Sequence, residues 1–227
     1  MNSTICVKTY PLPPVDKREV LRYAGARGEL PEISALMQEC IREAEGEIVG
    51  KVCYGEFPVT QQEQRLAFGF MTAGSAGLCK NLIGCDSAVI FGATIGIGID
   101  RLIARYGRIS PVKALLFQAI GAERIEALCD LFCEEISRQA MQNGHFTRPR
   151  FSPGYGDWPL EAQRDIFSAL DCPRKIGLTL NESLLMSPTK SVTALIGIGK
   201  GEWGVTASHC EACDKKDCVF GEHYENN

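Results

Sequence analysis

The sequence predicts a mixed α and β protein, with enough apolar residues to form the core of one large domain or two small ones. Hydrophobic residues make up 45% of the 227 residues and charged residues 23%, a balance typical of globular proteins. Along the chain, segments whose apolar residues recur at helical spacing alternate with short strand-like runs. These runs lie at residues 4–8, 48–54, 88–95, 176–180 and 192–198.

Charge and hydropathy exclude several classes of protein. The net charge is -4, and basic residues are spread among acids, so neither nucleic acid nor an anionic membrane is an expected partner. The N-terminus lacks the pattern of a signal peptide, and the longest apolar run, residues 88–99, is too short and glycine-interrupted to span a bilayer. We therefore expect a cytoplasmic protein whose eleven cysteines are mostly reduced core thiols.

Two amphipathic helices are predicted in the N-terminal part. Asp16 and Glu19 have the spacing of a capping box at the start of the first helix, and Gly25 follows its last apolar residue. The second helix is predicted over residues 31–44. Residues 71–82 are rich in small side chains and are predicted to form a tightly packed helix.

A glycine-rich turn follows the strand predicted at residues 88–95. Gly96-Ile97-Gly98 resembles the start of a dinucleotide-binding fingerprint, but Arg101 occupies the position of its third glycine. The sequence therefore favours a strand-to-helix turn in which the backbone packs closely against a neighbouring segment.

The longest helical pattern covers residues 112–141, and Gly121 is expected to bend or break it. Its second half carries three acidic residues spaced four apart, namely Glu126, Asp130 and Glu134. Carboxylates at this spacing repel one another unless a positive group lies over them. The row is therefore either a solvated surface or one side of a charged site.

Residues 148–159 cannot continue the helices predicted on either side, because they combine prolines with glycines. Pro153 fixes its own φ, and Gly154 allows backbone angles that are closed to other residues. Arg150 offers a planar fork of donors for a carboxylate, and Tyr155 offers an aromatic face with a hydroxyl group. The segment is either a loop shaped for a ligand or a surface connection. A further helix is predicted to begin at Pro159.

Two segments of this half resemble the activation domain of cobalamin-dependent methionine synthase. Arg150 to Pro159 resemble the family's Arg-x-x-Pro-Gly-Tyr-x-x-x-Pro loop. Residues 179–188 resemble its Thr-Glu-Ser-x-x-Met-x-Pro segment, and Ser191-Val192 begin a strand as in the family. The order and spacing agree over residues 120–198, whereas the first hundred residues are more similar to free-standing relatives than to the domain fused to a synthase.

The resemblance implies an α+β fold, with a single domain over residues 1–206 built on a twisted antiparallel sheet with flanking helices, and a small Cys-rich tail over residues 207–227. It also implies that S-adenosylmethionine binds and that the chain is a component of a cobalamin-dependent methyltransferase system. In the family, this ligand methylates an inactive Co(II) corrinoid after an electron has produced Co(I). The implied partners are a corrinoid-dependent methyltransferase or corrinoid protein, which carries the cobalamin, and an electron donor. No side chain is expected to act as an acid–base catalyst.

The resemblance also implies roles for individual residues. Arg150 binds the carboxylate of the ligand, and the other expected contacts are Tyr155, Pro153, Gly154 and, from the preceding helix, Glu126. Glu182 matches the family's Glu-Ser pair, and it either touches the ligand or braces the loop. The chain departs from the family at Trp158, where the family has cysteine, and at Leu160, where it has aspartate.

Cys210, Cys213 and Cys218 form a C-x2-C-x4-C pattern in a polar stretch near the C-terminus. Three thiols at this spacing suit an iron–sulfur cluster or zinc, with a fourth ligand from outside the chain or from Cys172, His209 or His223. Free thiols or a disulfide are the alternatives. The pattern supports a second candidate function, an iron–sulfur electron-transfer accessory protein. A non-catalytic scaffold for a corrinoid protein is the third.

Overall fold

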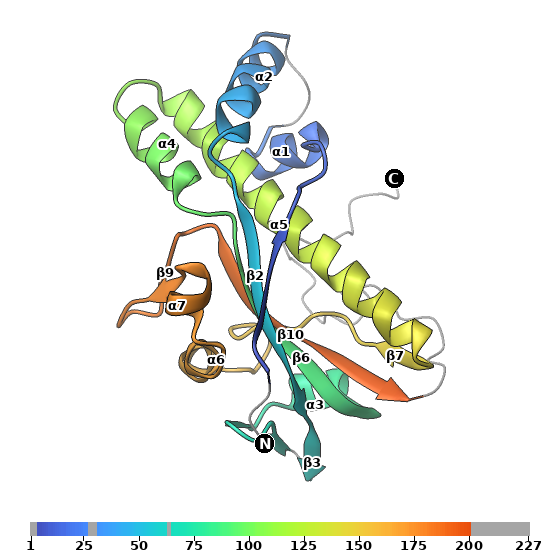
Figure 1. The fold of residues 1–227 in the computed structure, drawn as a ribbon. Helices are drawn as coiled ribbons and strands as arrows, with labels where there is room; N and C mark the ends of the chain where they lie inside the picture. Colours follow the sequence, from blue (N-terminus) through green and yellow to red (C-terminus); the bar gives the residue numbers. More distant parts are fainter. Residues whose placement is uncertain (1–3, 27–30, 63–64, 201–227) are drawn as a thin grey trace, which may run out of the picture.

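The computed structural model describes residues 4–26, 31–62 and 65–200. Its centre is a five-stranded sheet in which each pair of neighbouring strands is antiparallel. Helices flank the twisted sheet on both faces (Figure 1). This architecture confirms the predicted α+β fold. The strands lie in the order β1 (Cys6–Tyr10), β2 (Gly50–Pro58), β6 (Cys85–Thr94), β10 (Ser191–Lys200) and β7 (His145–Thr147).

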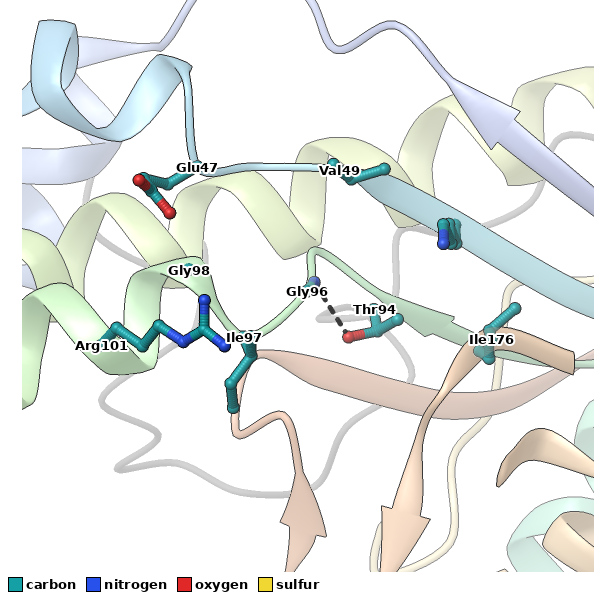
Figure 2. A pocket seen from close by; sticks show the side chains of 9 residues that line it. Glu47, Val49, Thr94, Gly96, Ile97, Gly98, Arg101 and Ile176 are labelled. Atoms are coloured by element: carbon teal, nitrogen blue, oxygen red, sulfur yellow. Dashed lines mark hydrogen bonds between the residues drawn. The ribbon is translucent and has the colours of Figure 1, made fainter. Parts of the chain in front are cut away.

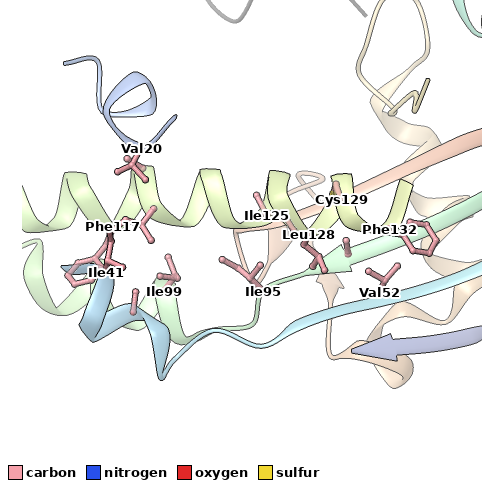
Figure 3. Packing of buried hydrophobic residues seen from close by; sticks show 14 of the residues in the cluster. Val20, Ile41, Val52, Ile95, Ile99, Phe117, Ile125, Leu128, Cys129 and Phe132 are labelled. Atoms are coloured by element: carbon pink, nitrogen blue, oxygen red, sulfur yellow. The ribbon is translucent and has the colours of Figure 1, made fainter. Parts of the chain in front are cut away.

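A long helix covers one face of the sheet and organises the helices around it (Figure 1). This helix is α5 (Pro111–Gln142), and α1 (Lys17–Tyr23), α2 (Pro31–Glu45) and α4 (Gly98–Tyr106) pack against it. Leu128 and Phe132 of α5 point toward Val52 of the sheet (Figure 3). In the part of the chain that the structure describes, no helix is both long and apolar enough to cross a membrane.

The other face of the sheet is covered by α6 (Gln163–Leu170) and α7 (Cys172–Ile176). Cys53, Ile90 and Leu195 face this side, because successive side chains of a strand point to opposite faces. Trp158 also belongs to this second core and is only 1% exposed. The smaller elements are β3 (Thr60–Gln62), β4 (Arg65–Ala67), β5 (Thr72–Ala73), α3 (Ala76–Asn81), the 3-10 helix η1 (Leu160–Ala162), β8 (Thr179–Leu180) and β9 (Met186–Ser187).

Of the two effects expected of Gly121, a break in the long helix does not occur, since α5 is continuous over 32 residues. A Cβ added at Gly121 would lie 2.8 Å from Cγ2 of Ile99 and 2.9 Å from Cγ of Lys190. Gly121 therefore allows α4 and the residue just before β10 to approach α5 closely. Helix propensity alone does not predict this role. The helix predicted over residues 71–82 is also shorter than expected, because only Ala76–Asn81 are helical.

Two other local predictions were wrong. Glu19 does not complete a capping box, because its carboxylate binds Arg22, while Asp16 alone caps α1. Residues 176–180 are not a continuous strand, because Pro173 lies in the first turn of α7 and that helix extends to Ile176. A proline that cannot continue one helix is well suited to the first turn of the next, which explains the second error.

An adjacent pair of charged residues is buried on α5, and no local sequence pattern predicts this burial. The side chains of Glu123 and Arg124 are 6% and 4% exposed and form an ion pair. Arg124 also donates to the carbonyl oxygens of Pro13 and Pro14, and Glu123 Oε1 accepts from the amide of Asp16 at 3.1 Å. The pair therefore holds the proline-rich segment between β1 and α1 against α5.

Candidate functional site

The first half of the loop at residues 148–159 continues the edge of the sheet. After β7, the amide of Arg148 donates to the carbonyl of Gly197 at 2.8 Å. Phe151 and Leu195 exchange two backbone hydrogen bonds, each of 2.9 Å. Arg150 is therefore held between two points of attachment to β10.

The second half of the loop is a compact turn. Gly154 and Gly156 have φ values of 90° and 56°, in the left-handed region that glycine adopts without strain. The Gly154 amide donates to the carbonyl of Trp158 at 2.9 Å, and the Tyr155 amide to that of Ser152 at 3.2 Å. Pro153 is buried beneath this turn, whereas the Tyr155 side chain is 58% exposed. The prediction that this segment is a loop with a defined backbone shape is therefore confirmed.

Asp157 fastens the end of the loop to the start of α3. Its Oδ1 accepts from Ser75 Oγ at 2.5 Å and from the Gly77 amide at 3.1 Å, and its Oδ2 accepts from the Ala76 amide at 2.6 Å. The hydrogen bond from Ser75, together with the two amides, lowers the pKa of the Asp157 carboxyl, because these donors stabilise its charged form.

The same helix also holds the start of the loop. Nδ2 of Asn81, at the end of α3, donates to the carbonyl of Pro149 at 3.2 Å. Arg148 Nη2 donates to the carbonyl of Ile83 at 2.6 Å. We call the contacts of Asp157 and Pro149 with α3 the α3 clasp. The clasp fixes the loop on both sides of the segment that carries Arg150 and Tyr155.

Arg150 lies over the acidic row of α5. Its Nη2 forms an ion pair with Glu126 and lies 3.8 Å from Oδ1 of Asp130. The positive group that such a row requires is thus present, and the row is one side of a charged cluster. Desolvation by neighbouring groups raises the pKa of the Asp130 carboxyl, although its side chain is largely exposed, with Arg150 acting in the opposite sense and Glu126 adding to the rise.

Arg150 retains a donor that the rest of the structure leaves unused. Its side chain is 27% exposed, and Nη1 is buried without a hydrogen-bond partner among the described residues. Cys129 and Cys133 lie on the same side of α5. Burial raises the pKa of Cys133 to about 12 and also raises that of Cys129, so both thiols are uncharged at neutral pH.

The structure brings together some of the predicted site residues and separates one. Arg150 and Glu126 are in contact, and Pro153, Gly154 and Tyr155 follow on the same loop. Glu182 lies instead in the turn between β8 and β9, where its carbonyl accepts from Arg164 Nη2 of α6 at 2.8 Å. Glu182 is therefore held against α6, whereas Arg150 lies against α5 on the opposite face of the sheet.

The predicted metal ligands Cys210, Cys213 and Cys218 lie outside the described residues. Among residues 4–26, 31–62 and 65–200, no group of three or more metal-binding side chains is found. The candidate fourth ligand Cys172 is fully buried, and its Sγ lies 3.6 Å from that of Cys53.

The expectation of core thiols holds for most of the other cysteines. Cys40, Cys53, Cys79, Cys129 and Cys172 are buried. Cys85 and Cys133 are half-buried, and Cys6 on the edge strand β1 is exposed, contrary to the expectation.

Two cavities lie away from the loop. One, of about 240 Å³, is next to the Gly96–Gly98 turn, and the side chains of Glu47 and Arg101 lie at its rim (Figure 2). A Cβ at Gly98 would lie 2.2 Å from the carbonyl oxygen of Glu47, which confirms the predicted close backbone packing at this turn. The other cavity, of about 580 Å³, lies under the proline-rich segment of residues 11–14. Neither is lined by Arg150 or Tyr155.

Comparisons with known proteins agree with this architecture. A search among curated proteins finds no match. The crystal structure of the MetH reactivation domain bound to AdoHcy superposes with a TM-score of 0.66 at 14% sequence identity, over 90% of this chain and 81% of that chain. The family model described as "Vitamin B12 dependent methionine synthase, activation domain" matches residues 79–201, which is more than half of the chain and includes the loop, α5 and β10. The chain therefore belongs to the family of the activation domain of vitamin B12-dependent methionine synthase.

Proposed function

We propose that this protein binds S-adenosylmethionine at the loop of residues 148–159 and reactivates a separate corrinoid-dependent methyltransferase by reductive methylation. Membership of the family supports the reactivation role. The related structure was determined with AdoHcy, the product that S-adenosylmethionine leaves after methyl transfer, which supports the class of ligand. The observation that carries the proposal is the half-buried Arg150, whose Nη1 has no hydrogen-bond partner in the described part of the chain, on a loop whose backbone is already fixed.

The donors and acceptors at the loop fit the methionine end of this ligand. A carboxylate is the natural partner of a guanidinium, since two parallel N–H···O bonds match its geometry. Among the described residues, Arg150 Nη1 has no hydrogen-bond partner, and Nη2 is bound only to side chains of α5. In the proposed complex, the ligand carboxylate takes the place of Glu126 on Arg150, and Glu126 is then available to the ligand ammonium.

The rest of the loop is assigned to positioning the ligand. Gly154 presents its backbone without a side chain, and the buried Pro153 holds that turn in place. Tyr155 supplies an exposed aromatic face. When bound, S-adenosylmethionine supplies a methyl group to the partner's corrinoid substrate after an external donor has reduced its cobalt, and S-adenosylhomocysteine departs. The protein contributes the geometry in which the sulfonium methyl meets the corrinoid.

The proposal predicts that Arg150→Ala weakens S-adenosylmethionine binding about 10- to 150-fold. This range corresponds to about 1.5–3 kcal/mol for hydrogen bonds to a charged group. Isothermal titration calorimetry measures the effect. Arg164→Ala is the control, because Arg164 is an exposed arginine that donates to a backbone carbonyl on the α6 side, away from the acidic row of α5. An unchanged dissociation constant in Arg150→Ala, in protein that unfolds at the wild-type temperature, would exclude Arg150 as the carboxylate ligand.

We also propose, from its C-x2-C-x4-C spacing alone, that the tail at residues 207–227 holds an iron–sulfur cluster or zinc through Cys210, Cys213 and Cys218. Anaerobically purified protein is then expected to contain iron with acid-labile sulfide, or zinc, and to lose it in Cys213→Ser. Cys6→Ser is the control, since Cys6 is an exposed thiol of β1 that is not among the proposed ligands. Iron and sulfide without S-adenosylmethionine binding would favour the electron-transfer function, and wild-type protein without metal would exclude the cluster.

A further inference from the structure

The cluster around Arg150 contains more negative than positive charge. One guanidinium faces two carboxylates, of Glu126 and Asp130, and Glu134 follows one helical turn further along α5. In the described part of the chain, Arg150 is the only basic side chain that forms a salt bridge with any of these acids. Cys129 and Cys133 add no charge, as their thiols are protonated. Arg150 together with Glu126 and Asp130 therefore has a net charge of about one negative unit at neutral pH.

If the proposed function is correct, the positive groups of the ligand complement this surplus of negative charge. S-adenosylmethionine carries a carboxylate, an ammonium and a sulfonium, so it has one negative and two positive groups. The Arg150 cluster has the inverse composition. Once the ligand carboxylate occupies Arg150, two carboxylates of α5 remain for two cations. S-adenosylhomocysteine has lost the sulfonium charge and offers only one.

We propose that Asp130 is a specificity-determining residue that makes this site favour the sulfonium ligand over its thioether product. Glu126 is the acid closest to Arg150 and serves the ammonium, and Asp130, at 3.8 Å from Arg150, supplies the additional charge. The attraction between Asp130 and the sulfonium disappears when the methyl group leaves, because the sulfur becomes neutral. The product then dissociates more readily than the substrate.

The expected size of the effect is modest because Asp130 is 67% exposed and water screens its charge. Asp130→Asn keeps the shape of the side chain and removes the charge. The variant should lower the ratio of affinities for S-adenosylmethionine and S-adenosylhomocysteine by about two- to five-fold, mainly through weaker binding of S-adenosylmethionine. Raising the ionic strength should lower the wild-type ratio in the same direction.

Glu134→Gln provides the matched control. Glu134 belongs to the same row and has the same charge, but it lies one turn beyond Asp130 and forms no ion pair with Arg150 among the described residues. Its neutralisation should leave the ratio close to that of the wild type. Titration calorimetry of both ligands, at low salt and at a pH well above the titration of carboxyl groups, compares the wild type with the two variants.

The ratio of the affinities for S-adenosylmethionine and S-adenosylhomocysteine distinguishes a charge effect from a structural one. A loss of packing at Asp130 would weaken both ligands equally and leave the ratio unchanged, and this result would overturn the inference. An equal fall of the ratio in Glu134→Gln would also overturn it, because the charge of the whole row would then matter and not that of Asp130. If the wild type binds neither ligand, the proposed function fails and this inference fails with it. Binding of both ligands with an unaltered ratio in Asp130→Asn removes the inference alone.

Discussion

Replacement of Trp158 by alanine should lower the free energy of unfolding by about 3–5 kcal/mol, the range for removing a large buried aromatic side chain. Trp158 is the largest of the fully buried side chains among the described residues, with 1% exposure, and its ring centroid lies 6.1 Å from that of Phe151. It packs in the core between the sheet and α6, so its loss opens a cavity directly beneath the loop that carries Arg150. Urea denaturation monitored by circular dichroism measures the change.

Trp158→Phe is the control for this prediction. The indole N–H of Trp158 is buried and has no hydrogen-bond partner among the described residues, so its removal costs no hydrogen bond. Phenylalanine also fills much of the volume and should retain most of the stability. A loss of less than about 1 kcal/mol in Trp158→Ala would contradict this prediction, because it would show that the neighbouring side chains close the space.

Glu123→Ala should destabilise the protein by about 3–5 kcal/mol, because it leaves the guanidinium of Arg124 buried without its counter-charge. Both side chains are almost completely enclosed. The substitution also removes the acceptor for the Asp16 amide, so the proline-rich segment and the start of α1 lose one of their attachments to α5. The midpoint of urea denaturation should fall accordingly.

The double variant Glu123→Ala, Arg124→Met tests the origin of this loss. Removal of both charges avoids an uncompensated ion in the core, so the double variant should be more stable than the sum of the two single effects indicates. The single variant Arg124→Met completes the double-mutant cycle. Strictly additive effects would mean that the two residues stabilise the fold independently, and the ion pair would then have no role of its own.

Local patterns were sufficient to predict much of the fold. The helix expected over residues 31–44 is α2 (Pro31–Glu45), and the buried strand expected at residues 88–95 is β6 (Cys85–Thr94). The apolar residues of α2 recur at the helical period, whereas β6 was recognised from a continuous apolar run, which is buried on both faces of the sheet. Strand order was not accessible in this way. For example, β10 pairs with β6 and β7, whose positions in the chain are distant, and no local pattern encodes that choice.

The candidate site was predicted in its chemistry but not in its supports. The acidic row on α5 and the arginine of the loop were both visible in the sequence, and the structure pairs Arg150 with Glu126. The role of Asp157 was missed, because nothing near it indicates that its partners begin at Ser75. The sequence held only a general signal for this contact, namely a carboxylate next to a bulky aromatic residue and, far away in the chain, a run of small residues. Glu182 was grouped with the loop by motif alone, and tertiary structure places it on the α6 side.

The α3 clasp has a consequence for how a ligand is received. Asp157 and Pro149 are held by α3, and Phe151 is held by β10, so the backbone between them takes its final shape during folding. No conformational entropy then has to be lost by this segment when a small molecule arrives, and the intrinsic affinity of its side chains is expressed in full. Association at such a preformed surface is governed by encounter and desolvation, and in the proposed complex the rearrangement would be confined to the exchange of Glu126 on Arg150.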